Sequence, residues 1–258
     1  MAAHILRTLP NERIIYFADN AHVPYGERPL EQIRGFAVGI TAFLVEKGCK
    51  AVVMACNMSS AVALEAARQE FRDLHVLGVI EPGAKAALDV REGKPVGVLA
   101  TTGTVNSGAY VRELQRRDKH CRVYQQACPK FVPLVESGLA DSEEAEAAAR
   151  TYVEPLLSEG CRTLILGCTH YPFLRRAIES AAGSGVRIVD PAEETARALK
   201  SLLAKGGILS DSLDCAHEFY ASGETDSFAK LGGKFLGRDM ESVALASVCD
   251  NGSASPLA

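Results

Sequence analysis

The sequence predicts an α/β fold made of two pseudo-symmetric domains, each built on a parallel sheet. Short apolar segments rich in β-branched residues alternate with longer amphipathic segments, a pattern typical of parallel sheets with helices on both faces. An internal repeat of about 110 residues indicates that this pattern occurs twice. The chain has 258 residues, of which 47% are apolar, so each copy has enough apolar residues for its own core.

The expected strands are short apolar runs bounded by glycine, proline or asparagine. They cover residues 13–18, 51–55, 76–80, 96–100, 122–126, 163–167 and 187–189. The expected helices cover residues 2–9, 30–47, 59–70, 83–91, 107–117, 143–159, 173–182 and 192–205. The last residues, 251–258, are predicted to form a frayed tail.

The repeat is clearest around two segments that each end in a cysteine and a polar residue. KGCKAVVMACN at residues 47–57 aligns with EGCRTLILGCT at residues 159–169. The alignment predicts a first domain from residues 1–81 together with 190–258, whose C-terminal part returns to it, and a second domain from residues 82–189.

The second copy opens with a strand and a hydroxyl-rich turn, PVGVLATTGTVNSGAY at residues 95–110. The equivalent positions of the first copy would precede Met1. The first domain is therefore expected to lack its opening strand and to start inside the following helix. A missing central strand leaves neighbouring strands without hydrogen-bond partners and a hole in the core.

Cys56 and Cys168 each end a predicted strand and precede a helix, at matched positions of the repeat. Ligands of open α/β sheets bind at this edge, so the two thiols are expected to face each other across a cleft between the domains. Such a pair suits proton transfer on both faces of one carbon. A helix N-terminus or His170 would favour the thiolate. The remaining cysteines are interpreted as core thiols, the usual place of this residue: Cys49, Cys121, Cys128, Cys161, Cys215 and Cys249.

Composition excludes several classes of protein. The chain carries 28 Lys and Arg against 32 Asp and Glu, a net charge of −4, which argues against a nucleic-acid binder. It has no apolar run long enough to span a membrane, and its N-terminus does not resemble a signal peptide. A cytoplasmic protein without disulfides is expected, and without a C-x-x-C pair no metal site is expected.

Seven segments together resemble glutamate racemase of the aspartate/glutamate racemase superfamily, in family order between residues 6 and 237. They are FADNAHVPYG, ACNMSS, GVIEPGAKAA, ATTGTVNSGAY, CPKFVPLVESG, LGCTHYP and DPAEETA. The resemblance implies racemisation of L- and D-glutamate without a cofactor, supplying D-glutamate for peptidoglycan synthesis, with the cell wall and cell shape depending on it. It also implies glutamate as the small-molecule partner, and a homodimer is a further expectation.

The resemblance assigns roles to particular residues. Cys56 and Cys168 match the two catalytic cysteines, His170 matches the histidine that assists the second, and Glu136 matches a carboxylate near that histidine. The residues expected to bind substrate are Tyr25, Gly26, Asn57, Met58, Thr104, Thr169 and His170. Met58 stands where the family usually has threonine, and a thioether is only a weak acceptor, so one substrate hydrogen bond is expected to be lost.

Simpler interpretations hold for other polar residues. Asp19 and His22 suit an ordinary turn, and Asp190 suits a helix cap, while both roles stay open for Glu81. Residues expected on the surface or in satisfied core positions are His4, His75, His120 and His217, with residues 112–119 as a solvated basic helix face.

Two other functions remain as alternatives. One is an aspartate or hydantoin-type racemase of the same superfamily. The other is a catalytically silent or impaired homologue, because the family opens with a strand and an Asp-Ser-Gly turn that this sequence does not contain.

Overall fold

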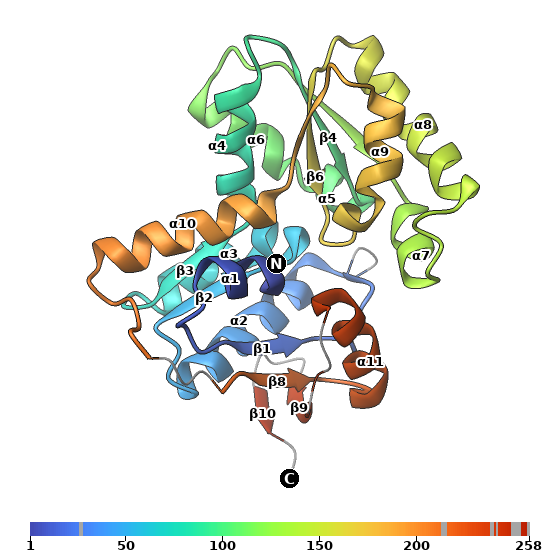
Figure 1. Cartoon of the computed structure of the whole chain (residues 1–258). Helices are drawn as coiled ribbons and strands as arrows, with labels where there is room; N and C mark the ends of the chain where they lie inside the picture. Colours follow the sequence, from blue (N-terminus) through green and yellow to red (C-terminus); the bar gives the residue numbers. More distant parts are fainter. Residues whose placement is uncertain (26–27, 213–215, 238–239, 241, 249–253, 257–258) are drawn as a thin grey trace. The chain divides into compact units, whose positions relative to one another are not determined.

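The computed structural model describes residues 1–25, 28–212, 216–237, 240, 242–248 and 254–256. It confirms the expected mixed α/β class with parallel sheets (Figure 1). The chain divides into two compact units. The first comprises Met1–Met54, Val62–Leu77 and Ala196–Ala258, and the second comprises Ala55–Ala61 and Gly78–Thr195. Both expected cysteines of the site, Cys56 and Cys168, therefore belong to the second unit.

The second unit contains a four-stranded parallel sheet in the order β5-β4-β6-β7. Its strands are β4 (Val96–Ala100), β5 (Val123–Ala127), β6 (Thr163–Gly167) and β7 (Arg187–Val189). The central strand β4 pairs along its whole length with both β5 and β6. Every residue of β4 and β6 is buried, which explains why these strands are continuous apolar runs rather than alternating ones.

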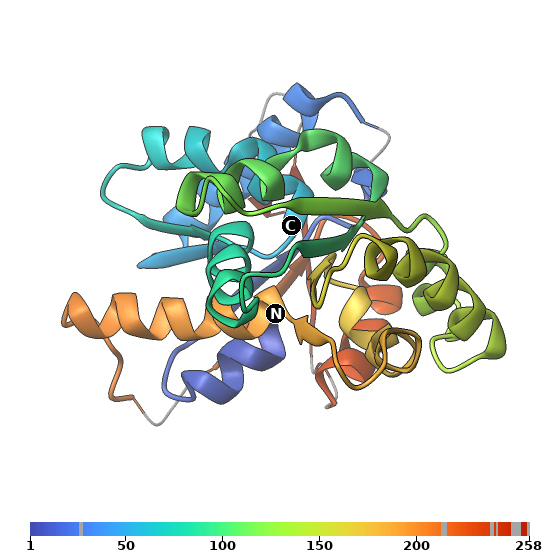
Figure 2. The same ribbon diagram turned by 90° about the horizontal axis from the view of Figure 1, so that it is seen from above.

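Helices cover both faces of this sheet. Figure 1 shows α4 (Ile80–Val90) and α6 (Ala109–Arg117) on one side of β4, and α8 (Glu143–Ser158) and α9 (Arg175–Ala182) on the other. In the view from above, α8 and α9 again lie side by side (Figure 2). Three short helices complete the connections: α5 (Thr102–Ser107), α7 (Phe131–Glu136) and the 3-10 turn η2 (Tyr171–Leu174).

The described residues of the first unit form two separate sheets. One contains β1 (Ile15–Ala18), β8 (Glu218–Ala221), β9 (Ala244–Val248) and β10 (Ala254–Pro256), and the other pairs β2 (Ala51–Met54) with β3 (His75–Gly78). The helices α1 (Ala2–Thr8), α2 (Leu30–Glu46) and α11 (Thr225–Leu236) belong to this unit. The helices α3 (Asn57–Glu70) and α10 (Pro191–Lys205) begin in the second unit and continue into the first. Phe43 of α2 anchors this core, because its ring packs edge-on against Phe17 and Tyr220.

The repeat equates β1 with β5 and β2 with β6, so β4 shows where the opening strand of the first unit would lie. Among the described strands, β1 pairs only with β8 and β2 only with β3. No described strand joins β1 to β2 as β4 joins β5 to β6. The helix expected at residues 2–9 is present as α1.

Several expected elements differ from the observed ones. The strand expected at residues 76–80 ends at Gly78, and Ile80 begins α4 instead. The helix expected at residues 107–117 is interrupted at Gly108, whose φ of 62° suits glycine. The frayed tail is wrong for Ala254–Pro256, which pairs antiparallel with β9. The described helices contain no stretch that is both long and apolar enough for a membrane span.

Candidate active site

The turn after β2 carries Cys56 and leads directly into α3. The carbonyl of Cys56 accepts a hydrogen bond of 2.9 Å from the backbone N–H of Ser60. Asn57, Met58, Ser59 and Ser60 are all buried. Cys56 is half-buried at this helix start, where unpaired backbone N–H groups favour negative charge.

The turn after β6 carries Cys168, Thr169 and His170. The Sγ atom of Cys168 lies 3.8 Å from Nδ1 of His170. Burial raises the pKa of the Cys168 thiol to about 12, although hydrogen bonds from the backbone of His170 and from Thr169 oppose this rise. A negative charge on Cys56 raises the same pKa further.

His170 also contacts a carboxylate on its other side. Its Nε2 atom lies 3.3 Å from Oε1 of Glu136, at the end of α7. Burial lowers the pKa of His170, while the Glu136 carboxylate acts in the opposite direction. His170 thus contacts Glu136 through one ring nitrogen and Cys168 through the other.

Tyr110 of α6 connects the two cysteine-bearing turns. Its hydroxyl donates a hydrogen bond of 2.7 Å to Oδ1 of Asn57, and its ring packs beside Gly167, directly before Cys168. The sequence alone assigns Tyr110 no role, although it ends the quoted segment ATTGTVNSGAY. The available signal is a polar aromatic residue at the start of a helix next to the hydroxyl-rich turn.

Thr104 lies in α5, the short helix that follows β4, the strand next to β6. Thr101 caps α5 by accepting a hydrogen bond from the backbone N–H of Thr104, and the two hydroxyls lie 3.0 Å apart. Thr104 is buried, as is Met58 in the first turn of α3. The turns after β2 and β6, together with the first residue of α3, thus carry Cys56, Asn57, Cys168, Thr169 and His170. Tyr110 links the two turns, Glu136 at the end of α7 contacts His170, and Thr104 lies in α5 after the strand next to β6.

Tyr25 belongs to the first unit, where the Asp19 carboxylate organises its loop. Asp19 accepts hydrogen bonds from the Tyr25 hydroxyl at 2.5 Å and from the Ser222 hydroxyl at 2.7 Å, and it pairs with Nδ1 of His22 at 2.6 Å. Asp19 and His22 thus stabilise a turn, as the sequence predicts. The sequence pattern does not predict the third partner of this turn, Ser222, because it follows β8, about 200 residues later in the chain. Gly26 lies outside the described residues.

The remaining candidates have structural roles in the described chain. Asp190 caps α10, as expected, because its Oδ1 accepts a hydrogen bond of 2.8 Å from the backbone N–H of Ala192. Glu81 lies in the first turn of α4, whose N-cap residue is Val79. Cys121, Cys128 and Cys161 are buried, and this burial raises the pKa of each thiol. Cys49 is half-buried. Cys215 and Cys249 lie outside the described residues.

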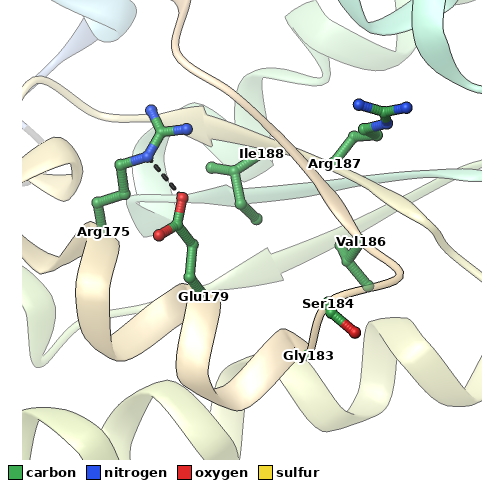
Figure 3. A pocket seen from close by; sticks show the side chains of 7 residues that line it. All are labelled: Arg175, Glu179, Gly183, Ser184, Val186, Arg187 and Ile188. Carbon is green, nitrogen blue, oxygen red and sulfur yellow. Dashed lines mark hydrogen bonds and ion pairs between the residues drawn. The ribbon is translucent and has the colours of Figure 1, made fainter.

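Figure 3 shows a pocket elsewhere in the second unit, between the end of α9 and the start of β7. Its lining residues are Arg175, Glu179, Gly183, Ser184, Val186, Arg187 and Ile188, and Arg175 is paired with Glu179 at 2.7 Å. The pocket lies at the amino end of β7, whereas Cys168 follows the carboxyl end of β6. It is therefore a feature separate from the candidate site. Within the described part of the chain, no cluster of three His, Cys, Asp or Glu side chains could hold a metal ion.

Comparison with known proteins identifies relatives along nearly the whole chain. Residues 1–199 match the Asp/Glu/Hydantoin racemase family. A glutamate racemase from Desulforudis audaxviator is 43% identical over 91% of this chain and 88% of its own length. A crystal structure of a glutamate racemase isoform from Bacillus anthracis is 39% identical and covers 95% of this chain and 91% of its own, with a TM-score of 0.90.

A second crystal structure, of the Francisella tularensis glutamate racemase in complex with D-glutamate, is 31% identical. It covers 95% of this chain and 92% of its own, with a TM-score of 0.89. Family match, sequence identity and fold therefore agree: the chain belongs to the aspartate/glutamate/hydantoin racemase family of amino-acid isomerases, and its relatives are glutamate racemases.

Proposed function

We propose that this protein interconverts L- and D-glutamate without a cofactor, using Cys56 and Cys168 as the two proton-transfer groups. One observation carries the proposal. The two thiols follow equivalent strands of the repeat, β2 and β6, and Tyr110 contacts a sequence neighbour of each, Asn57 after Cys56 and Gly167 before Cys168. A relative that binds D-glutamate in its crystal structure supports the choice of substrate.

In one direction, the Cys56 thiolate removes the α-proton of glutamate, and the Cys168 thiol gives its proton to the opposite face of the carbon. The product has the inverted configuration, Cys56 ends as a thiol and Cys168 as a thiolate. The raised pKa of Cys168 supports its role as the initial donor, because a thiol with this pKa holds its proton at neutral pH. Cys56, at the start of α3, is better placed for the thiolate.

In the other direction, Cys168 has to lose its proton first. His170 supports this step, since its pKa is lowered and its ring is therefore neutral and able to accept a proton. The Glu136 carboxylate on the far nitrogen stabilises the charged imidazolium that results. Glu136 and His170 thus act together as the base for the second thiol.

The carboxylate and ammonium groups of glutamate need polar partners close to both thiols. Asn57 and the first backbone N–H groups of α3 suit the α-carboxylate, and the hydroxyls of Thr104 and Thr169 add further donors. Tyr25 and Gly26 are proposed to hold substrate from their loop. Met58 provides no hydrogen-bond donor, so Ser59 or Ser60 is proposed to compensate for the lost contact.

The same resemblance supports a wider setting for the reaction. D-Glutamate made by this enzyme is proposed to supply peptidoglycan synthesis in the cytoplasm, and the enzyme is proposed to form a homodimer. Sedimentation of the purified chain measures the last point directly, and a monomer at all concentrations contradicts it.

The decisive experiment measures interconversion of the two glutamate enantiomers by chiral chromatography in the variants Cys56→Ser and Cys168→Ser. Each variant is expected to lose turnover by about 10²–10⁴-fold, because each removes one proton-transfer group. Retained turnover in either variant contradicts the two-thiol assignment.

Matched controls separate loss of chemistry from loss of fold. Cys49→Ser and Cys161→Ala change cysteines at the amino ends of β2 and β6 and should leave turnover close to that of the unchanged chain. Turnover of aspartate with none of glutamate would instead favour the other branch of the family. Absence of turnover with every amino acid in a folded chain would favour the silent homologue.

A further inference from the structure

Tyr110 is a fully buried tyrosine beside the candidate site. Its side chain is 0% exposed, although it carries a hydroxyl that needs a hydrogen-bond partner. That partner is Oδ1 of Asn57, 2.7 Å away, in the residue directly after Cys56. The buried hydroxyl of Tyr110 is thus hydrogen-bonded to a side chain beside the turn that carries Cys56.

The ring of the same tyrosine touches the other cysteine-bearing turn. A Cβ atom placed on Gly167 would lie 3.3 Å from the Tyr110 ring and 2.9 Å from the Leu99 carbonyl oxygen. Position 167 therefore has room only for glycine between β4 and the Tyr110 ring. Tyr110 lies against the residue before Cys168 and bonds to the residue after Cys56.

The direction of this hydrogen bond determines the orientation of the Asn57 amide. Burial and the nearby negative groups of Asp190 and Cys168 raise the pKa of Tyr110, so the hydroxyl stays protonated and can donate. An amide oxygen that accepts from Tyr110 points toward it, so the amide nitrogen, with its two N–H donors, points away. Without this bond, the amide could rotate and present its oxygen instead.

We propose that Tyr110 is a positioning residue, which orients the Asn57 amide so that its N–H groups are presented to the substrate beside Cys56. The inference rests on the proposed function for its substrate. Its structural part, the fixed orientation of Asn57, can be tested separately.

The kinetic test uses Tyr110→Phe, which removes the hydroxyl and keeps the ring. We expect kcat/KM for both enantiomers to fall about tenfold, as for the loss of one buried hydrogen bond. If Tyr110 acts through Asn57, the same change in an Asn57→Ala background should have almost no further effect. Tyr152→Phe, another largely buried tyrosine of the second unit, is the matched control and should leave kcat/KM unchanged. Full additivity of the two substitutions, or an unchanged kcat/KM in Tyr110→Phe, overturns the proposal.

A second measurement does not depend on turnover. The side-chain amide signals of Asn57, identified by their loss in Asn57→Ala, should shift and lose order in Tyr110→Phe but not in Tyr152→Phe when followed by ¹H–¹⁵N NMR. Unchanged signals in Tyr110→Phe overturn the positioning role. If the signals respond but the unchanged chain neither racemises glutamate nor binds D-glutamate by calorimetry, the proposed function fails while the orientation of Asn57 by Tyr110 stands.

Discussion

At the scale of single residues, His170 shows two opposing effects on one side chain. Burial lowers its pKa from the usual value of 6.5, because water no longer stabilises the imidazolium, and the Glu136 carboxylate acts against this. The lowered pKa means that folding is less favourable wherever the unfolded chain would hold the proton. The free energy of unfolding therefore decreases as the pH falls below about 6.5, down to the lowered pKa of His170 in the folded chain.

Replacing Glu136 by glutamine tests this balance. Because the carboxylate is the group that raises the pKa, Glu136→Gln should lower the pKa of His170 further, while burial of the ring stays the same. Titration of the imidazole carbon-bound protons by NMR measures the shift. The signals of His22, which pairs with Asp19, serve as an internal control. A higher pKa for His170 in the variant would contradict the contact between these residues.

The catalytic candidates can be predicted from the sequence because each lies within one short motif. Cys168, Thr169 and His170 are consecutive, and their contacts follow from one turn. Tyr110 and Ser222 cannot be predicted in the same way. Their partners, Asn57 and Asp19, are distant in sequence, and only the folded sheet brings them together.

At the scale of elements, local signals explain the starts of helices well. Ser142 precedes α8, and its hydroxyl accepts a hydrogen bond of 3.2 Å from the backbone N–H of Ala145. Three acidic residues in the first turn of α8 complement the positive end of the helix dipole. The predicted helix at residues 143–159 agrees with α8 for this reason, since its signals are encoded within one turn.

The cap itself can be tested by substitution. Ser142→Ala should lower the free energy of unfolding by about 1 kcal/mol, because one N–H group of α8 loses its partner. Ser142→Gly should cost only a few tenths of a kcal/mol at such a position. Urea unfolding followed by circular dichroism measures both. An unchanged free energy of unfolding in Ser142→Ala would indicate that the hydroxyl does not act as a cap.

Other elements depend on partners that are remote in the chain. β8 pairs with β1, about 200 residues earlier, and β10 forms only against β9. The sequence pattern does not predict these strands, and at residues 254–256 it predicts a frayed end instead. A short segment of this kind adopts the strand conformation because of its partner, and its own sequence carries little signal for it. The helix α7 also escapes prediction, since six residues give too short a periodic signal.

At the scale of the whole molecule, the two units are unequal copies of one plan. Among the described strands, β4 lies between β5 and β6, whereas β1 and β2 have no strand between them. The domain division at residues 1–81 with 190–258 and at 82–189 stays a prediction, supported by the repeat.

The inequality predicts different amide exchange in equivalent strands. N–H groups along a strand point alternately to its two edges, and β6 has partners on both edges, β4 and β7. Among the described strands, β2 is paired only with β3, so its other edge faces no described strand. We expect the faster-exchanging amides of Ala51, Val52 and Val53 to exchange with deuterium much faster than any in Thr163–Gly167, measured by NMR on the intact chain. Equal protection of the two strands would show that the edge of β2 is covered, and that the first unit reaches the stability of the second by another route.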